Sequence, residues 1–418
     1  MEVPSTLAAN TIASPGPDPA ADFSSTKSSA RYAITRTTSE EEVSNLESDW
    51  NRLSESATSP NVFMTYGWFR AWNQRFTRED RNGRRPNVLV IKKGSAVVGI
   101  SPLILRKVSR FGFGARKLEF VGREGDYNDF VLGDDPAGQS EAIVEFLAQT
   151  QDQWDLVNLR DLRDTGNSIA RVEHALSRAG LIYRLIPEEE RCPYLPIDAR
   201  WSDMVGRFSR SPGRKMDGLH TFRKKLHRLE RLSAEGLRVR IIENPSGELG
   251  LVKKLIALES QKHVDGKLSL PFIAKYPEVF QSLFDTLGPR GWFRIGLMEL
   301  GERPIGSRVV FRCGKKLWDF LTAYDHTFSR LSPGAMLVSA LVDYGFSRGY
   351  DEFDFMRGEE SYKMRWCTGV HQSYWLRIWS GNWIARAHAL VYLDLKPAVK
   401  RLFAARTDQG AREQKSAR

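Results

Sequence analysis

Residues 317–356 constrain the fold more than any other stretch of the chain. Residues 317–324 are mostly apolar and predict a strand, residues 334–348 have the spacing of an amphipathic helix, and residues 352–355 predict a second strand. Ser332, Pro333 and Gly334 stand where that helix begins, and serine suits an N-cap while proline suits a first helical turn. A strand, helix and strand in this order favour a mixed α/β sheet.

The same order of elements recurs in both halves, although no sequence repeat is visible. Each half runs from a strand through two helices and several antiparallel strands to another helix and strand. In the first half we expect strands at 32–37, 87–92, 96–106, 117–121, 128–132, 156–159 and 181–186, and helices at 39–54, 66–76, 139–151 and 168–179. In the second half we also expect strands at 237–242, 292–300, 305–313 and 371–378, and helices at 215–235, 248–263 and 276–287. The fold class is therefore α/β with mixed sheets, in two tandem domains.

The sequence divides into four segments. Residues 1–29 are rich in Ser, Thr, Ala and Pro and have no apolar periodicity, so we expect disorder there. A boundary near 195–205 separates an N-terminal domain over 30–198 from a C-terminal domain over 199–381. Residues 382–418 predict a basic helical tail, packed on the protein body or alternatively resting on an acidic membrane surface.

Composition narrows the class of protein. The chain of 418 residues has no uninterrupted apolar run of the ~18 residues that suit a membrane span, and its N-terminus has no basic start followed by an apolar segment. Cys192, Cys313 and Cys367 lie far apart, which favours a reducing cytoplasm. His220, His227 and His263 show no metal-ligand spacing, so no metal is expected. The net charge of +11 favours a polyanionic ligand or surface.

The start of the 334–348 helix is the first candidate site. The N–H groups of Gly334, Ala335 and Met336 would be free to bind a phosphate there, and Arg330 would add positive charge. The alternative is that Ser-Pro-Gly simply starts a helix, as it does in many proteins.

The end of the 352–355 strand is the second candidate site. Asp354 lies late on this strand, directly after the helix, and ligands of α/β sheets bind at such strand ends. A charged run with Arg357, Glu360 and Lys363 follows. The alternative for this run is a solvated charged loop, but the neighbouring Tyr362 and Trp366 indicate partial burial and favour more than a surface role. Asp354 could equally cap the following turn.

The order of these residues resembles a known family. The stretch Tyr324-Asp325, then Leu331-Ser332-Pro333-Gly334, Asp354-Phe355 and Tyr362-Lys363 looks like the second half of GNAT-fold acyltransferases of the CelD-like, cellulose-biosynthesis group, which are related to the Fem-type aminoacyltransferases. The resemblance is most specific over 215–365 and implies a degenerate first GNAT-like domain over 30–195.

This resemblance implies a transferase that moves an acetyl or other acyl group from acyl-CoA to an amine or hydroxyl, without a metal. It also implies a link to exopolysaccharide or cell-envelope biosynthesis. Fem relatives use aminoacyl-tRNA and carry a long helical-hairpin insertion, which is absent from this sequence, so acyl-CoA is the expected donor.

The implied mechanism is direct transfer within a ternary complex. The CoA diphosphate would be held at residues 330–336 (Arg330, Leu331, Ser332, Pro333, Gly334, Ala335 and Met336), with the pantetheine arm between 317–324 and 352–356. A backbone N–H near Ala323 or Tyr324 would polarise the thioester. Asp354 and Glu360 are the candidate bases, with Asp325 behind them, and Tyr324 or Tyr362 would reprotonate the thiolate. Asp325, Arg357 and Lys363 are the candidate substrate-binding residues.

A basic helix near residue 215 supports other functions. Its cations are Arg214, Lys215, Arg223, Lys224, Lys225, Arg228 and Arg231. They could contact an anionic acceptor or the 3′-phosphate of CoA, or they could form a solvated face. A nucleic-acid or membrane-surface binder is the main alternative, but RNA binding favours aromatic side chains on the basic face, whereas Phe222 belongs to the apolar stripe.

Overall fold

The structure is a computed structural model that describes residues 31–391, apart from residue 58 and residues 79–82, 111–112, 123–124, 164–167, 198–216, 246–247, 249 and 261–271. The segments expected to be disordered (1–29) and to form most of the basic tail (from 392) lie outside the described residues, as do Arg214 and Lys215.

The first half contains four helices of ten or more residues and two small sheets. Its elements are β1 (Ala33–Thr37), α1 (Glu40–Ser44), α2 (Glu47–Ser56), η2 (Val62–Met64), α3 (Tyr66–Arg78), β2 (Arg85–Pro86), β3 (Val88–Lys93), β4 (Ala96–Ser101), β5 (Leu103–Arg110), β6 (Phe113–Phe120), β7 (Val131–Leu132), α4 (Pro136–Gln149), β8 (Leu156–Arg163), α5 (Ser168–Arg178) and β9 (Ile182–Pro187). Ser39 caps α1 and Glu42 completes a capping box, but the predicted 39–54 helix is broken between α1 and α2.

The second half is built around one larger sheet. Its elements are β10 (Cys192–Pro196), α7 (Asp217–Ser233), β11 (Leu237–Ile242), α8 (Leu251–Ser260), α9 (Phe272–Lys275), α10 (Pro277–Leu287), β12 (Phe293–Leu300), β13 (Arg303–Cys313), β14 (Lys316–Tyr324), η5 (His326–Leu331), α11 (Pro333–Ser347), β15 (Glu352–Asp354), α12 (Ser361–Trp366), β16 (Gly369–His371), β17 (Ser373–Trp379) and α13 (Trp383–Leu390). The predicted 317–324 strand, 334–348 helix and 352–355 strand are confirmed as β14, α11 and β15.

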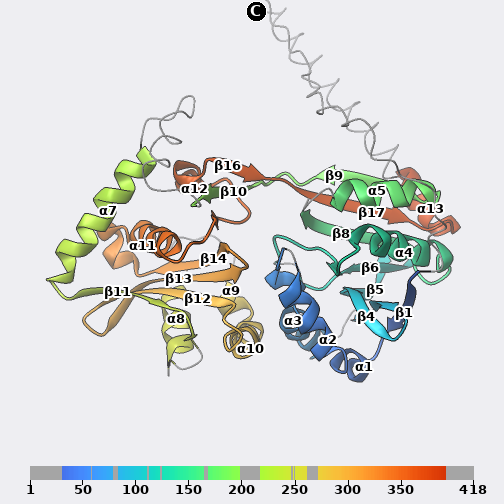
Figure 1. Ribbon diagram of the computed structural model, residues 1–418, viewed down its shortest axis with the longest axis horizontal. Helices are drawn as coiled ribbons and strands as arrows, with labels where there is room; N and C mark the ends of the chain where they lie inside the picture. The colour runs from blue at the N-terminus through green and yellow to red at the C-terminus, as the bar shows by residue number, and fades with distance from the viewer. Residues whose placement is uncertain are drawn as a thin grey trace, which may run out of the picture.

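Strand pairing crosses between the halves. The strand orders are β1-β3-β4-β7, β2-β5-β6-β8-β17-β9 and β11-β12-β13-β14-β15-β10-β16. Strand β10, which precedes the boundary expected at 198, pairs with β15 and β16, whereas β17 pairs with β8 and β9 of the first half. Figure 1 shows the two connections, β9 to β10 and β16 to β17, running side by side between the halves. Each half therefore completes its sheet with a strand from the other side of that boundary.

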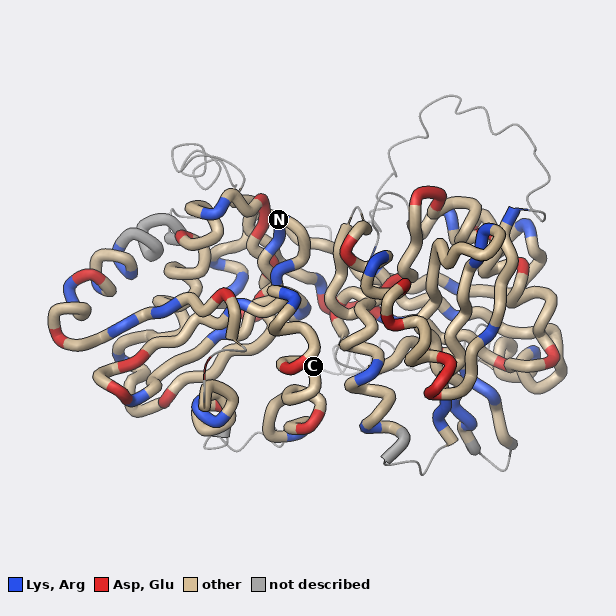
Figure 2. Tube along the Cα trace, turned by 60° about the horizontal axis from the view of Figure 1, so that its bottom comes forward, with Lys and Arg blue, Asp and Glu red and all other residues tan. Residues whose placement is uncertain are grey.

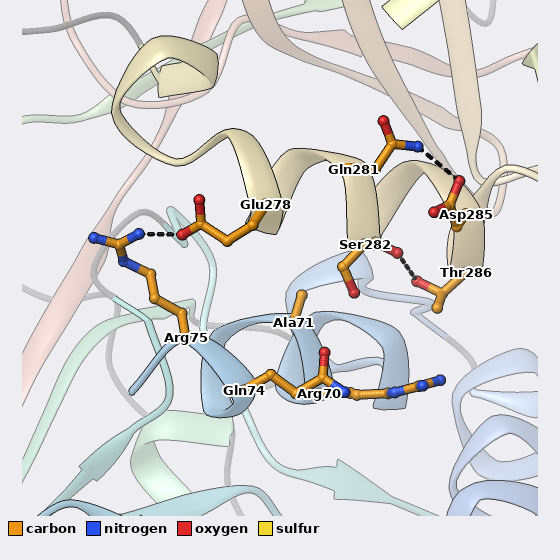
Figure 3. Close-up of a pocket in the computed structure, with 9 residues that line it drawn as sticks. All are labelled: Arg70, Ala71, Gln74, Arg75, Glu278, Gln281, Ser282, Asp285 and Thr286. Atoms are coloured by element: carbon orange, nitrogen blue, oxygen red, sulfur yellow. Dashed lines mark hydrogen bonds and ion pairs between the residues drawn. The ribbon is translucent and has the colours of Figure 1, made fainter. Parts of the chain in front are cut away.

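The two halves also share an apolar core. Phe63 of the first half stacks on Trp318 of β14, with ring centroids 5.7 Å apart, and Trp72 of α3 meets Tyr276 beside α10 at 4.9 Å. A polar hollow of about 460 Å³ lies between α3 and α10 (Figure 3). Its side chains bond one another: Arg75 pairs with Glu278 across the two helices, and Gln281 bonds Asp285. We assign this hollow to the contact between the halves.

Charged residues of both signs are distributed over the whole protein. Figure 2 shows basic and acidic positions interspersed over both halves. None of the described helices is long and apolar enough to cross a membrane.

Candidate active site

Strands β14 and β15 run parallel, and β15 pairs along its whole length with only the first three residues of β14. Their register joins Lys316 to Glu352, Leu317 to Phe353 and Trp318 to Asp354, where β15 ends. Strand β14 continues to Tyr324, paired on its other side with β13. Among the described residues, 319–324 therefore have a neighbouring strand, β13, on one side only. Because the backbone N–H groups of a strand point alternately to its two sides, about half of those in this segment point toward the unpaired side. The open edge begins beside Asp354.

A bulge bends β14 at the start of this open edge. Val309 of β13 faces Leu321, whereas the next residue, Val310, faces Asp319, so Phe320 is an extra residue on β14. Bulges of this kind increase the local twist and often lie beside active sites. The bulge turns β14 at the point where β15 ends.

The chain leaves β14 through η5 and enters α11, whose first turn differs from the expectation. Ser332 occupies the N-cap position, but its side chain makes no capping hydrogen bond and its φ is 57°. The N–H groups of Ala335 and Met336 both donate to the Ser332 carbonyl, at 3.1 Å each. Of the three amides expected to be free, only that of Gly334 has no hydrogen bond among the described contacts. The turn therefore offers one free backbone N–H to a phosphate, where the sequence predicted three.

The first turn of α11 packs closely on β13. Gly306 has no side chain, and a Cβ there would lie 3.0 Å from the Cβ of Pro333. Arg308, two residues later on β13, donates from Nε to the Gly334 carbonyl at 3.2 Å. A Cβ on Gly334 itself would meet its nearest neighbour only at 3.8 Å. Strand β13 therefore holds the turn in place, while a small side chain could be accommodated at position 334.

A buried ion pair underlies this turn. Arg308 bonds Asp319 of β14, and both side chains are buried. Burial alone would lower the pKa of Arg308, but the Asp319 carboxylate raises it above its ordinary value. The guanidinium lies 5.8 Å from the ring centroid of Tyr362 on α12. Tyr362 is 36% exposed, but desolvation of its hydroxyl raises its pKa to about 12. Arg308 thus joins β13, β14, α11 and α12.

Helix α7 lies beside the same turn. It packs on α11, and Arg228 donates to the carbonyl of Arg330 at 3.3 Å. Half-burial lowers the pKa of Lys225, and the neighbouring cations Arg228 and Lys224 lower it further. Part of the predicted basic helix therefore adjoins the expected phosphate-binding turn.

Asp354 is the most deeply buried of the predicted catalytic residues. Its Oδ1 accepts the Met356 N–H at 2.7 Å, and its Oδ2 accepts the hydroxyl of Tyr127 at 2.7 Å. One oxygen therefore caps the following turn, while the other meets a residue of the first half. Burial raises the pKa of Asp354 to about 6, although Arg163 and His371 oppose the shift. Asp354 is a candidate acid or base near neutral pH.

A charged cluster surrounds this carboxylate. His371 Nε2 lies 3.2 Å from Glu352 and 4.0 Å from Asp354. Arg163 contacts His371 at 3.3 Å, and Lys316 bonds Glu352 at 2.9 Å. Glu352, Asp354 and His371 offer ligand atoms within 4.8 Å of one another, which the absence of histidine spacing in the sequence did not suggest. Two cations already contact Glu352 there, and a metal ion would have to displace them.

The charged run after β15 is partly ordered as helix α12. Glu360 is exposed and pairs with Lys363 at 3.0 Å. Lys363 is buried and donates to the Arg357 carbonyl at 2.6 Å, so it orients the loop. Arg357 itself reaches the first half, where it pairs with Asp126 at 3.0 Å and Asp161 at 2.8 Å. The charged run is therefore tied to both halves, and the alternative of a purely solvated loop is excluded.

The remaining predicted residues lie at the other end of β14. Asp325 caps η5, accepting from the Thr327 N–H at 2.9 Å, and pairs with Arg303 at 2.5 Å, which together with Thr327 holds its pKa below the ordinary value despite burial. Tyr324 is half-buried beside the position of Gly334. Arg330 is exposed, while Leu331 packs with the apolar residues under the turn.

Backbone strain is concentrated at these positions. Among the described residues, three that are not glycine have a left-handed φ: Asp161 at 57°, Ser332 at 57° and Met356 at 59°. Such conformations cost about 1–3 kcal/mol each and gather at functional sites. Ser332 lies at the turn that begins α11, Met356 lies two residues after the end of β15, and Asp161 pairs with Arg357.

Several contacting residues were missed by the sequence analysis. Tyr127, Arg163 and His371 come from segments remote in sequence, and no local pattern links them to Asp354. Arg308 and Asp319 did carry a signal, because each is a charge inside an apolar strand, and such charges are buried only when paired.

Comparisons with known proteins agree with this geometry. Residues 217–364 match the family model described as an acetyltransferase (GNAT) domain. No curated protein matches the chain significantly. The solved structure of FemX is 13% identical, covers 79% of this chain and 95% of its own, and has a TM-score of 0.53. The mixed α/β fold is therefore confirmed, and the acetyltransferase (GNAT) domain model matches the second half of the chain.

Two further solved structures are more distant. The C-terminal domain of a putative lysylphosphatidylglycerol synthetase from Agrobacterium fabrum is 11% identical over 69% of this chain and 85% of its own, with a TM-score of 0.43. A tandem GNAT protein from the clavulanic acid biosynthesis pathway is 12% identical over 84% and 99%, with a TM-score of 0.39. The family match supports an acyltransferase of the GNAT type, and none of these likenesses identifies the CelD-like group.

Proposed function

We propose that the second half transfers an acetyl or other acyl group from acyl-CoA to an amine or hydroxyl acceptor. The observation that carries this proposal is the open edge of β14, which starts where β15 ends at Asp354 and leads to the first turn of α11. The match of residues 217–364 to the acetyltransferase (GNAT) domain supports it.

The donor would lie along this edge. Its pantetheine arm would bond the outward N–H and C=O groups of residues 319–324, as an added strand does. Its diphosphate would meet the Gly334 N–H at the positive end of α11, a helix of 15 residues. Arg228 of α7 lies beside the turn, and Lys225 precedes it by three residues on the same helix; these cations would contact the 3′-phosphate.

The chemistry would be a direct displacement. The acceptor nitrogen or oxygen attacks the thioester carbonyl, the new bond to carbon forms as the C–S bond breaks, and an outward N–H of β14 stabilises the oxyanion. A carboxylate takes the acceptor's proton, and an acid returns one to the CoA thiolate. Asp354 or the exposed Glu360 would be the base. Tyr362, with a pKa of about 12 beside Arg308, would be the acid.

Two finer statements rest on the resemblance of the sequence alone. One is the link to polysaccharide or cell-envelope biosynthesis, and the other is the use of acyl-CoA in place of aminoacyl-tRNA. The nucleic-acid or membrane-surface alternative would use the same α7 cations without an acyl donor.

Donor binding tests the proposal directly. Acetyl-CoA at a concentration well above its Kd should raise the melting temperature by several degrees, because a ligand that binds only the folded state stabilises it. Charged tRNA and single-stranded RNA serve as competing ligands in the same assay. An unchanged melting curve with millimolar acetyl-CoA, or stabilisation by RNA alone, contradicts acyl-CoA as the donor.

A further inference from the structure

A second hollow, of about 440 Å³, lies in the first half against its six-stranded sheet. Its lining comes from β5, β6, β8 and β17, from Phe76 of α3 and from the loop after β15. Six of the lining side chains are cationic: Arg84, Arg106, Lys117, Arg160, Arg357 and Arg377. Only Glu119 and Asp161 are acidic. We call this hollow the basic pocket.

Carboxylates inside and outside the lining of the basic pocket pair with four of its six cations. Glu119 is shared between Arg106, at 3.1 Å, and Lys117, at 2.5 Å. Asp161 faces Arg357, and burial raises the pKa of Asp161 to about 7, so this carboxyl carries only part of a negative charge near neutral pH. Outside the lining, Glu188 pairs with Arg160 at 2.7 Å and Asp126 pairs with Arg357 at 3.0 Å. The lining itself is cationic by composition, with six cationic side chains and two acidic ones.

Aromatic rings contact three of the arginines. The Arg160 guanidinium lies 4.6 Å from the ring centroid of Trp375. The Arg377 guanidinium lies 3.6 Å from the ring centroid of Trp375, and that of Arg84 lies 4.1 Å from the ring centroid of Phe76. Stacking uses the flat face of a guanidinium, and its N–H groups project in the plane, where they suit carboxylate or phosphate oxygens. The pocket therefore combines oriented guanidinium groups with the aromatic side chains of Phe76 and Trp375.

Two further features are typical of a ligand site. Asn128, only 3% exposed, lines the pocket and donates from Nδ2 to the Arg160 carbonyl at 3.0 Å, but its Oδ1 has no hydrogen bond among the described residues. Buried polar atoms in proteins rarely lack a hydrogen-bond partner. Asp161 is one of the residues with a left-handed φ, at 57°.

The basic pocket adjoins the candidate active site. Arg357 follows Asp354 by three residues and lines the pocket. On β8, Arg160 and Asp161 line the pocket, whereas Arg163 contacts His371 beside Asp354. The two sites are thus held by the same strand and the same loop.

We propose that the basic pocket binds a small molecule carrying at least two negative charges on clustered oxygens, as in a phosphate ester or a polycarboxylate. We further assign this molecule as the acyl acceptor, held by its anionic group while its amine or hydroxyl reaches the open edge of β14. This second assignment rests on the proposed transferase function, whereas anion binding does not.

Calorimetric titration of the full chain with inorganic pyrophosphate and with citrate tests the proposal. Binding should weaken at least tenfold in Arg377→Gln and Arg106→Gln, and Arg377→Lys should recover part of it. Arg238→Gln is the matched control, because Arg238 is exposed on β11 and loses the same charge outside the pocket. Melting temperatures of all variants establish that they fold.

The competing site for pyrophosphate is the α11 turn, so Gly334→Asp is titrated as well. Binding within twofold of the parent in Gly334→Asp supports the pocket. Loss in Gly334→Asp with none in Arg377→Gln and Arg106→Gln overturns it, as does the absence of binding by the parent chain. Tighter pyrophosphate than citrate binding assigns the phosphate ester class, and the reverse assigns polycarboxylates.

The same titrations separate the two proposals. Pyrophosphate binding that depends on Arg377, without any stabilisation by acetyl-CoA, leaves the basic pocket standing and removes the transferase. Stabilisation by acetyl-CoA without pyrophosphate or citrate binding does the opposite.

Discussion

The hydroxyl of Tyr127 donates a hydrogen bond of 2.7 Å to Oδ2 of Asp354, although the two residues are 227 positions apart in the chain. Both side chains are fully buried, Asp354 at the end of β15 and Tyr127 in the loop that follows β6. Burial and the nearby carboxylate raise the pKa of Tyr127 well above its ordinary value, so it stays protonated and remains a donor. The contact connects the first half to the point where β14 and β15 stop pairing.

Asp354 should make the stability of the protein depend on pH. Its pKa of about 6 in the folded protein exceeds the ordinary value of 3.8, so the folded state binds this proton more tightly than the unfolded chain. The contribution of this group to the free energy of unfolding is therefore largest below pH ~4, falls as pH rises to ~6, and stays constant above. Asp354→Asn should remove a fall on the order of 2–3 kcal/mol from the urea-unfolding profile.

Asp351→Asn is the control for this profile, because Asp351 is exposed at the start of the same segment. Unfolding is measured between pH 4 and pH 8 for the three proteins. A full pH-dependent fall that persists in Asp354→Asn contradicts the assignment.

Arg308 and Asp319 should behave as a buried pair. Arg308→Met and Asp319→Leu alone should each destabilise the protein by about 3–5 kcal/mol, because each leaves one buried charge without its partner. The double variant should recover much of this loss. Arg348→Met supplies the comparison, since the exposed Arg348–Glu243 pair should contribute about 0–1 kcal/mol. Additive effects in the double-mutant cycle count against direct coupling.

Gly334 should separate donor binding from folding. Gly334→Ala should fold and keep the stabilisation by acetyl-CoA, because its Cβ would have only ordinary contacts. Gly334→Asp should also fold, since an acidic side chain is favourable near a helix N-terminus, but it should abolish the stabilisation by repelling the diphosphate. Thermal melts with and without acetyl-CoA measure both. Equal stabilisation of the two variants would place the donor elsewhere.

Removal of metal ions should leave the protein unchanged. Lys316 and Arg163 supply positive charge to Glu352, which lies between them and His371. Melting temperatures after dialysis against EDTA, and after addition of Zn²⁺, should agree. Stabilisation by Zn²⁺ that His371→Ala abolishes would instead identify a metal site.

The exchanged strands should prevent either half from folding alone. A fragment of residues 31–197 lacks β17, which lies between β8 and β9, and a fragment of residues 199–391 lacks β10, which lies between β15 and β16. Circular dichroism of each fragment should show no cooperative thermal transition, whereas a fragment of residues 31–391 should retain one. Cooperative unfolding of either short fragment contradicts this interdependence.

Local patterns predicted the central unit well. Helix and strand periodicity located β14, α11 and β15, and Asp354 was placed late on its strand, because these features depend on neighbours in the chain. The free amides at Ala335 and Met336 were predicted wrongly, since Ser332 adopts a left-handed φ and its carbonyl accepts both. The strand expected at 371–378 was found as β17 and the end of β16, but its pairing with β8 and β9 was not expected.

The amino-acid sequence by itself determined the approximate positions of most helices and strands, the turn that begins α11, and the excess of positive charge. Tertiary structure alone decided which strands pair, which charges are buried together, and that Tyr127, Arg163 and His371 surround Asp354. The physical reason is that periodicity and capping act over a few residues, whereas strand pairing and the burial of ionised groups join segments hundreds of residues apart, where no local pattern records the partner.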